Sequence, residues 1–438
     1  MSQSNLLQYV PAEARYHYKP LDDEQNAVSY WSEAAAALGE FEENLHESLY
    51  GYLDDEDDSG KPRLLEEPHI SRLRTFVEDK KQVFELLRSG VQCRRVQFYA
   101  DFDEQGGIED HVDSMSSLRD LATAWLALAR VRIAEGRYAD AARELTDCGE
   151  MGYLLCCGES FVLQYLVGLT VSGIAQTGFR LLAAEGKSRG DSLDDLIVAV
   201  DRWIDESDQA ARCYRVELCR FVIPEIDHLT ACGSVESQVD RLLDHHYPNE
   251  PFPDEDGQPT LAEDDIESRR QWRRDGIVSL VENHPHPFDP VATVRQLGQL
   301  VADQIARLQH RRFSWTAPLR ELGRRYRQSR FKARTRHWPN QFLVDFPFSC
   351  LGPGEHARQQ VAELLELMGS QYRAELEPPS EPELQAARDR LRSVPNALGL
   401  LVAHALLPMD IFSSENLHRE RLRTTREALA NARSGPGS

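Results

Sequence analysis

Long apolar runs are absent from this chain of 438 residues. None reaches the roughly 18 consecutive apolar residues of a membrane-spanning helix, because Gln, Gly, Ser and Thr interrupt even the most apolar stretch, residues 161–179. We expect this stretch to be a central helix buried among others, with a membrane-associated helix as the alternative. The first 30 residues also lack a basic segment followed by an apolar one, the mark of a secretory signal. The sequence therefore predicts a cytoplasmic protein without an integral membrane span.

Cysteine is sparse, with eight residues in the chain, and no two of them are spaced as Cys-x-x-Cys. Zinc ribbons and thioredoxin-like sites require that spacing. Cys156 and Cys157 are adjacent, and Cys213 and Cys219 are six positions apart. In a chain without a visible secretory signal, we expect these thiols to be reduced and mostly buried.

Motifs that carry chemistry are missing as well. The sequence has no phosphate-binding Gly-x-x-x-x-Gly-Lys-Ser/Thr loop and no His-Glu-x-x-His metal helix, and residues 158–161 end before the second glycine of a Gly-x-Ser-x-Gly turn. No cofactor is predicted. A hydrolase or a metal-dependent enzyme stays open as an alternative, because sequence separation does not show whether a nucleophile, a base and an orienting group meet in space.

Four histidines, His245, His246, His284 and His286, flank one segment of the chain. Imidazole is a ligand for zinc and other transition metals. Adjacent histidines at a helix end and histidines between prolines are also common in solvated loops, and we favour that interpretation. No metal site is predicted.

Acidic residues outnumber basic ones, 72 to 50, which gives a net charge of −22. With 41% hydrophobic and 28% charged residues, the composition is that of an acidic globular protein rather than a disordered one. Residues 1–68 hold 16 acids against four bases, including the run 54–58, which we expect to stay solvated. Four prolines fall within residues 247–259, so residues 247–265 are predicted to form an acidic linker.

The strongest pattern lies between residues 117 and 152. With Ala122 as the first position, Trp125, Ala129, Gly136 and Ala141 stand where a helix-turn-helix repeat of about 34 residues requires them. The small side chains of Ala129 and Ala141 let two helices approach closely, and Gly136 permits a tight turn between them. Residues 122–153 therefore resemble a tetratricopeptide repeat, a resemblance that implies a hairpin packed against further hairpins.

This resemblance covers one unit only, and no second copy follows at the same offset. Arg132 and Tyr153 depart from the family pattern, which has an aromatic residue and a proline at these positions. A helical hairpin that obeys the same close-packing rules outside the family is the alternative. The pairs Asn26-Ala27 and Gly136-Arg137 are also similar to segments of bacterial helical proteins of uncharacterised function, which implies no activity.

Helical periodicity of apolar residues extends along most of the chain. Only residues 95–99 and 342–348 favour extended structure. The predicted fold class is all-α, a tetratricopeptide-like array of helical hairpins followed by a second helical lobe. The expected helices are 23–38, 71–88 with Gly90 just past its end, 159–184, 192–229 with a break at Pro224, 235–246, 291–308, 319–336, 355–372, 381–392, 397–406 and 415–431. The expected divisions are an acidic N-terminal segment (1–68), a helical-hairpin domain (69–246), the linker (247–265) and a C-terminal lobe with a basic helix (266–433).

Basic charge is concentrated in residues 311–338, which contain ten Lys or Arg residues and a single acid, Glu321. Interleaved aromatic residues, among them Tyr326 and Trp338, provide the stacking faces that nucleic-acid grooves use. The alternative interpretation is that the arginines pair with the chain's own surplus of acids, and we favour it because the overall acidity repels nucleic acid at long range. The ten bases are Arg311, Arg312, Arg320, Arg324, Arg325, Arg327, Arg330, Lys332, Arg334 and Arg336.

These patterns lead to a hypothesis of a non-catalytic intracellular scaffold or adaptor that binds a protein partner through a groove between helices. The candidate contact residues are Arg132 and Arg137 on the hairpin, expected to be exposed, together with Arg324 and Arg325. Binding of nucleic acid or anionic lipid by residues 311–338 is the alternative from another functional class. The hypothesis rests on the predicted architecture alone, since no chemical motif in the sequence supports it.

Overall fold

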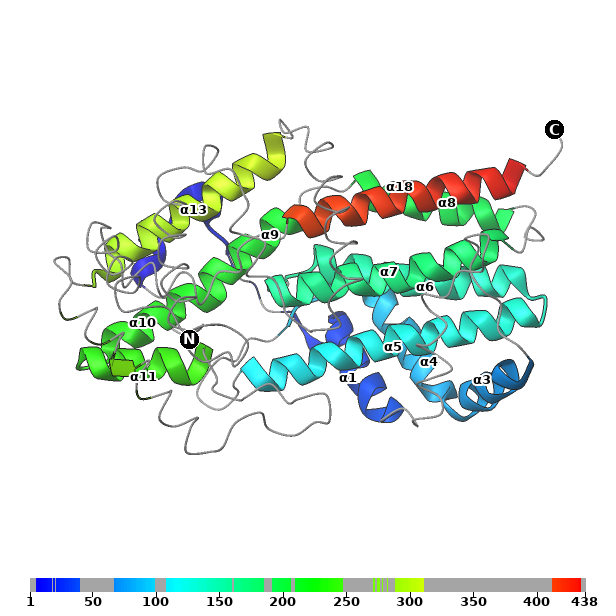
Figure 1. Ribbon diagram of the computed structural model, residues 1–438, viewed down its shortest axis with the longest axis horizontal. Coiled ribbons are helices and arrows are strands. Elements are labelled where there is room, and N and C mark those ends of the chain that lie inside the picture. The colour runs from blue at the N-terminus through cyan, green and yellow to red at the C-terminus, as the bar shows by residue number, and fades with distance from the viewer. Residues whose placement is uncertain are drawn as a thin grey trace, which may run out of the picture. The chain divides into compact units, whose positions relative to one another are not determined.

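The computed structural model of the protein (Figure 1) describes residues 5–17, 19, 21–39, 67–98, 108–159, 161–184, 191–205, 209–246, 271, 274, 275, 278, 282, 288–310 and 412–434. Of the residues described, 87% are helical and none belongs to a strand. The all-α prediction is therefore confirmed. Of the expected helices, those over 319–336, 355–372, 381–392 and 397–406 lie outside the described residues, as does the extended segment 342–348.

The chain forms two compact units, each built from two separate parts of the sequence. The larger unit comprises residues 16–217 and 410–438, and the smaller comprises residues 1–15 and 218–409. These units do not coincide with the segments expected from sequence, because residues on both sides of position 68 pack in the larger unit. The predicted linker 247–265 lies outside the described residues, so that boundary stays a prediction.

The larger unit is a bundle in which α5, α6 and α7 pack side by side (Figure 1). Helix α4 packs against α6 and against α1, while α3 packs against α5. Helix α8 packs on α6, and α18 lies along α7 and α8. The helices are α1 (Ala27–Leu38), α3 (Glu67–Asp79), α4 (Lys81–Cys93), α5 (Ile108–Ala134), α6 (Tyr138–Cys157), α7 (Val162–Ala184), α8 (Asp191–Asp205), α9 (Gln209–Val216) and α18 (Phe412–Ser434).

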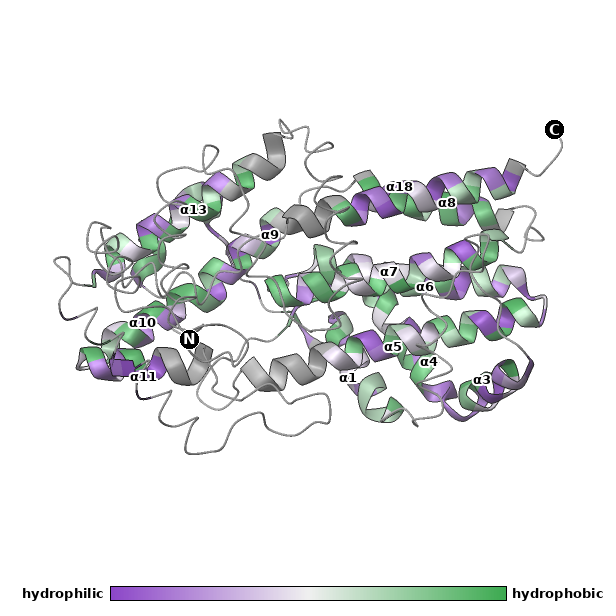
Figure 2. Cartoon of the chain, in the orientation of Figure 1, coloured by the Kyte–Doolittle hydropathy of each residue, from purple (hydrophilic) through white to green (hydrophobic). Residues whose placement is uncertain are grey.

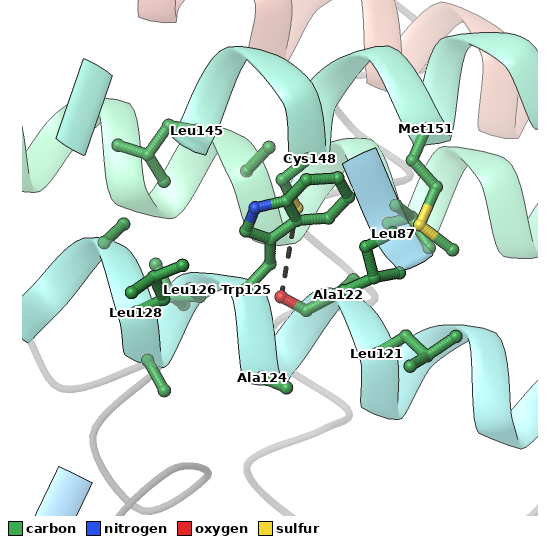
Figure 3. Close-up of a cluster of buried hydrophobic side chains, with 14 of the residues drawn as sticks. Leu87, Leu121, Ala122, Ala124, Trp125, Leu126, Leu128, Leu145, Cys148 and Met151 are labelled. Atoms are coloured by element: carbon green, nitrogen blue, oxygen red, sulfur yellow. Dashed lines mark hydrogen bonds between the residues drawn. The ribbon is translucent and has the colours of Figure 1, made fainter. Parts of the chain in front are cut away.

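Helices α5 and α6 form the predicted hairpin. Gly136 lies in the turn between them with φ of 73°, a backbone conformation that favours glycine. Helices α5 and α6 pack against each other, and the small residues Ala129 of α5 and Ala141 of α6 are both fully buried. Figure 3 shows the Trp125 side chain of α5 beside Cys148 of α6, among other buried apolar residues of this core.

The region predicted as one helix over residues 71–88 contains two helices, α3 and α4, separated at Lys80. Lys80 has a non-helical backbone conformation, with φ of −104° and ψ of 28°, and its ammonium donates hydrogen bonds to the C-terminal carbonyls of α1, at 3.2 Å from Ala37 and 2.6 Å from Leu38. The prediction that Gly90 follows the helix end is wrong. It lies inside α4, where a Cβ would stand 2.2 Å from the indole Nε1 of Trp31, so glycine is required for the close approach of α1.

A buried polar network joins the start of α1 to residues 95–98. Asn26 caps α1 by accepting from the backbone N–H of Val28 at 3.3 Å. Its amide also bonds the backbone of Gln97 twice, donating to the carbonyl at 2.6 Å and accepting from the N–H at 3.0 Å. The strand expected over residues 95–99 is absent over its described part, where Gln97 makes one isolated bridge to Glu159. Side-chain hydrogen bonds take the place of a sheet.

At the start of α7, two side chains accept hydrogen bonds from the first backbone N–H groups. The Gln164 side chain accepts from the backbone N–H of Phe161 at 2.7 Å, and Glu217 accepts from that of Val162 at 2.9 Å. Among the described helices, α7 alone is long enough and apolar enough to cross a membrane. Half of its most apolar 18-residue window is buried inside the protein. Figure 2 shows hydrophobic residues recurring along α7.

Helix α18 covers part of α7 and α8. Its own residues Leu422, Thr425 and Leu429 are buried. Arg426 pairs with Asp201 of α8 at 2.6 Å from Nε to Oδ1. The helix therefore combines an apolar inner face with a charged outer one, and hydrophilic residues cover much of it in Figure 2.

The smaller unit includes two short 3₁₀ helices and three α-helices. Pro224, where a break or kink was predicted, stands in the first turn of α10, which follows a π-helix (Glu217–Val222). The chain changes from π-helical to α-helical geometry there, but it is not broken, since residues 209–231 are helical throughout. Arg241 of α11 forms two hydrogen bonds of 2.7 Å to Glu225 of α10. The guanidinium of Arg295 on α13 lies 5.0 Å above the ring of Tyr9. The 3₁₀ helices are Asn5–Tyr9 and Ala12–Ala14, and the α-helices are α10 (Ile223–Ala231), α11 (Val235–His246) and α13 (Pro290–His310).

Replacing Asn26 by alanine tests the buried network. Asn26→Ala removes the α1 cap and leaves the N–H and carbonyl of Gln97 without these partners in a dry site, so we expect a loss of about 3 kcal/mol in unfolding free energy. Urea unfolding followed by tryptophan fluorescence measures it. Ser32→Ala, at an exposed position of α1, is the control and should change stability by less than about 0.5 kcal/mol. Equal stability of the two variants would contradict the structural role of Asn26.

Candidate functional site

The predicted contact residues Arg132 and Arg137 lie at the turn end of the α5–α6 hairpin. The Arg132 side chain is 22% exposed and that of Arg137 is 48% exposed. Arg132 pairs with Glu135 at 3.1 Å, and Arg137 pairs with Asp140 at 2.6 Å. Both arginines are thus already matched by acids of their own hairpin.

Further ion pairs surround this turn. Arg143 lies 3.3 Å from Asp140, and Arg74 of α3 lies 3.9 Å from Glu135. The hydrogen bond from Arg137 holds the pKa of Asp140 below its usual value. A partner that binds here has to compete with acids already in place, and exposed ion pairs of this kind contribute little to stability.

The other candidate residues fall largely outside the part of the chain that the structure describes. Arg324, Arg325 and the rest of the basic segment 311–338 are among them. His245 and His246 end α11, whereas His284 and His286 lie outside the described residues. Within the described ranges, no three His, Cys, Asp or Glu side chains are grouped so as to hold a metal ion.

The structure reveals a recess that the sequence did not predict, between α4, α6 and α8 of the larger unit. Its volume is about 440 Å³, within the range of small-molecule and peptide sites. Helix α6 separates and supports α4 and α8, since it packs against both. The recess is lined by Val91, Gln92, Arg94, Thr146, Asp147, Glu150, Asp195, Val198, Ala199 and Arg202.

Helical spacing brings these side chains together. Thr146, Asp147 and Glu150 are within four positions of one another on α6, so they share one face. On α8, Asp195 and Arg202 are seven positions apart, which again places them on one face. Arg94 enters the lining directly after α4, where its left-handed backbone with φ of 56° ends the helix.

Glu150 is engaged within the recess. Its carboxylate accepts hydrogen bonds from the guanidinium of Arg202 and, at 3.2 Å, from the indole of Trp203. Both donors come from α8, so this carboxylate fixes α8 against α6. The arginine of the pair is neutralised and contributes little positive charge to the recess.

Asp147 differs from Glu150, because no hydrogen bond or ion pair to its carboxylate is present among the described residues. Burial, together with the negative charge of Glu144, raises its pKa to about 6 against the lowering effect of Arg88. Its neighbour Thr146 gives no donor, since that hydroxyl bonds the carbonyl of Ala142 at 2.8 Å. Keeping the half-buried Asp147 carboxylate charged therefore lowers the stability of the folded protein.

A second carboxylate, Glu144, anchors the base of this region. It is buried, and it accepts from Arg88 of α4 at 2.6 Å and from the Trp125 indole of α5 at 2.9 Å. Three helices are thereby fixed around one charge. Because Glu144 and Asp147 are three positions apart on α6, the anchor also sets where Asp147 points.

One serine–histidine contact bears on the hydrolase alternative. The Ser172 hydroxyl of α7 lies 3.4 Å from the Nε2 of His418 on α18, and Gln176 donates to that hydroxyl at 3.3 Å. Burial and two nearby arginines lower the His418 pKa to about 4, so the ring is neutral at physiological pH. Ser172 is buried within a helix, and among the described residues no carboxylate orients the imidazole. This arrangement fits packing between α7 and α18.

No protein-family model matches the chain, and no match was found among curated proteins or solved structures. Function is therefore inferred from the geometry of the described residues. Sequence inspection missed Asp147 because one acid among 72 carries no distinguishing signal.

Removing the Asp147 charge is expected to stabilise the protein. The pKa of Asp147 is 3.8 in the unfolded chain and about 6 in the folded protein. Its charged form therefore lowers the free energy of unfolding, fully above pH 6 and not at all below pH 3.8. Asp147→Asn should therefore raise the unfolding free energy by about 2 kcal/mol at pH 7.5 and by much less near pH 4.5. Urea unfolding at both pH values provides the measurement. Asp79→Asn, at an exposed position, serves as control, and destabilisation by Asp147→Asn at pH 7.5 would show that its carboxylate has a structural partner.

Proposed function

We propose that the protein is a non-catalytic intracellular adaptor that binds a protein partner in the recess between α4, α6 and α8. The observation that carries the proposal is the half-buried Asp147, kept charged in an open recess without a partner among the described residues. Residues retained against stability are typical of sites selected for binding. The anchored Glu144 and Glu150 beside it keep the walls of the recess fixed, which limits the entropy lost on binding.

The hairpin architecture gives further support. The turn at Gly136, the buried Ala129 and Ala141, and the packing of α6 against both α5 and α7 are features expected of a tetratricopeptide-like array. In such arrays, stacked hairpins present an extended surface to a partner protein. We therefore assign the partner surface to helices α4, α6 and α8, with the hairpin-tip residues Arg132 and Arg137 as secondary contacts.

Filling the recess tests this function. Full-length tagged protein carrying Ala199→Trp should lose a stoichiometric partner that the wild type captures from native lysate at moderate salt, because the indole occupies the partner's volume. Ala36→Trp places the same side chain at an exposed position of α1 and should retain the partner. Mass spectrometry of the eluates gives the measurement, and equal thermal unfolding of the two variants shows that both fold.

Other outcomes of this capture are informative. Partner recovery unchanged by Ala199→Trp but lost with Arg132→Glu and Arg137→Glu would move the interface to the hairpin tip. Recovery unchanged in all variants would contradict an interface on the α4–α8 region. Nuclease-sensitive nucleic acid in the eluate, falling steeply with added salt, would instead favour the basic segment 311–338.

A further inference from the structure

The recess carries more information about its ligand than its shape alone. We propose that it binds a basic side chain of the partner protein, an arginine or lysine, with the carboxylate of Asp147 as the counterion. This inference rests on the proposed adaptor function and specifies what the partner must present.

The charges in the recess favour a cation. Three carboxylates line it, from Asp147, Glu150 and Asp195, against the guanidiniums of Arg94 and Arg202. Arg202 is paired with Glu150, so it is not available to an anion. Neither Asp147 nor Asp195 has an ion-pair partner among the described residues. Among the lining groups that are left, the carboxylates of Asp147 and Asp195 outnumber the single guanidinium of Arg94, so the recess carries a net negative charge that attracts a cation.

Hydrogen bonding leads to the same ligand class. Deprotonated Asp147 can only accept hydrogen bonds, and the protein supplies no donor to it from the described residues. A guanidinium or ammonium offers several N–H donors and forms charge-assisted bonds with a carboxylate. Such a ligand would replace the water that a half-buried carboxylate has lost.

The walls suit the stem of a basic side chain. Val91 from α4 and Val198 and Ala199 from α8 provide apolar surface, and Val198 is 68% exposed. Arginine and lysine bury their methylene groups on such surfaces while the charged end reaches a polar group. The volume of about 440 Å³ also leaves room for the residues on either side, so the natural ligand is a peptide segment rather than an isolated side chain.

Binding should weaken in acid. Asp147 faces Arg88 of α4, the carboxylates of Glu144 and Glu150 together with Arg143 of α6, and, across the recess, Arg94 at the end of α4 and Asp195 and Arg202 of α8. With its pKa near 6 in the free protein, it is mostly charged at pH 7.5 and mostly protonated at pH 5. A cation binds the charged form, so affinity should fall about tenfold over this interval.

The test uses the full chain with labelled valine methyl groups, followed by NMR during titration with the blocked tripeptide acetyl-Ala-Arg-Ala-amide. We expect shifts of the Val91 and Val198 methyl signals, assigned by substitution of each valine by alanine. The same peptide with neutral citrulline in place of arginine is matched in shape and should bind at least tenfold more weakly. A glutamate peptide should not bind.

Two variants separate the role of Asp147 from general effects of charge. Asp147→Asn should weaken arginine-peptide binding at least tenfold and remove its dependence on pH, while Glu85→Gln, at an exposed position of α4, should leave both unchanged. Equal binding of the arginine and citrulline peptides, binding of the glutamate peptide, unchanged affinity in Asp147→Asn, or absence of shifts would each overturn the inference.

Partner capture and arginine-peptide binding together distinguish this inference from the adaptor function on which it rests. Partner capture lost in Ala199→Trp without arginine-peptide binding would keep the adaptor function and reject the basic side chain as its ligand. Arginine-peptide binding with capture unaffected by Ala199→Trp would reject the protein partner at this recess. Spermidine is titrated in parallel, because tighter binding of this free polyamine than of the peptide would also overturn the assignment to a partner protein.

Discussion

The carboxylate of Glu144 is buried where α4, α5 and α6 meet, and each neighbouring helix contributes to holding it. Arg88 reaches it from α4 and the Trp125 indole reaches it from α5, at 2.6 and 2.9 Å. A buried charge tolerates little displacement from its donors, because an unmatched charge in a dry site is very unfavourable. The rotation of α6 about its axis is therefore fixed, and everything that α6 presents to its surroundings is fixed with it.

The same charge that anchors α6 also shapes the recess. Glu144 lies one turn from Asp147, and its negative charge, in addition to burial, opposes ionisation of that residue. A structural carboxylate thus changes the ionisation of a second carboxylate that lines the recess. The hairpin tip offers a contrast, because Arg132 and Arg137 are matched by Glu135 and Asp140 on their own hairpin.

Several elements followed from the sequence because local rules govern them. The turn at Gly136, the burial of Ala129 and Ala141, and the change of helix type before Pro224 each depend on one residue's backbone or size. The division at Lys80 was missed because no glycine or proline marks it, and the carbonyls that Lys80 bonds at the end of α1 are distant in sequence. The recess was missed for a similar reason, since it exists only when α4 and α8 are placed on either side of α6. Glycine is common both just after a helix end and inside a helix that another helix approaches closely, and Gly90 belongs to the second case.

Helix α18 has a consequence for how the protein is made. It covers part of α7, the most apolar helix in the described chain, yet it follows α7 only after residues 185–411. At a synthesis rate of 5–20 residues per second, about 10 to 45 s pass between the two helices leaving the ribosome. During that interval the α7 surface that α18 will cover is open to water and to other nascent chains. The larger unit therefore cannot complete its fold during synthesis until residues 412–434 have been translated.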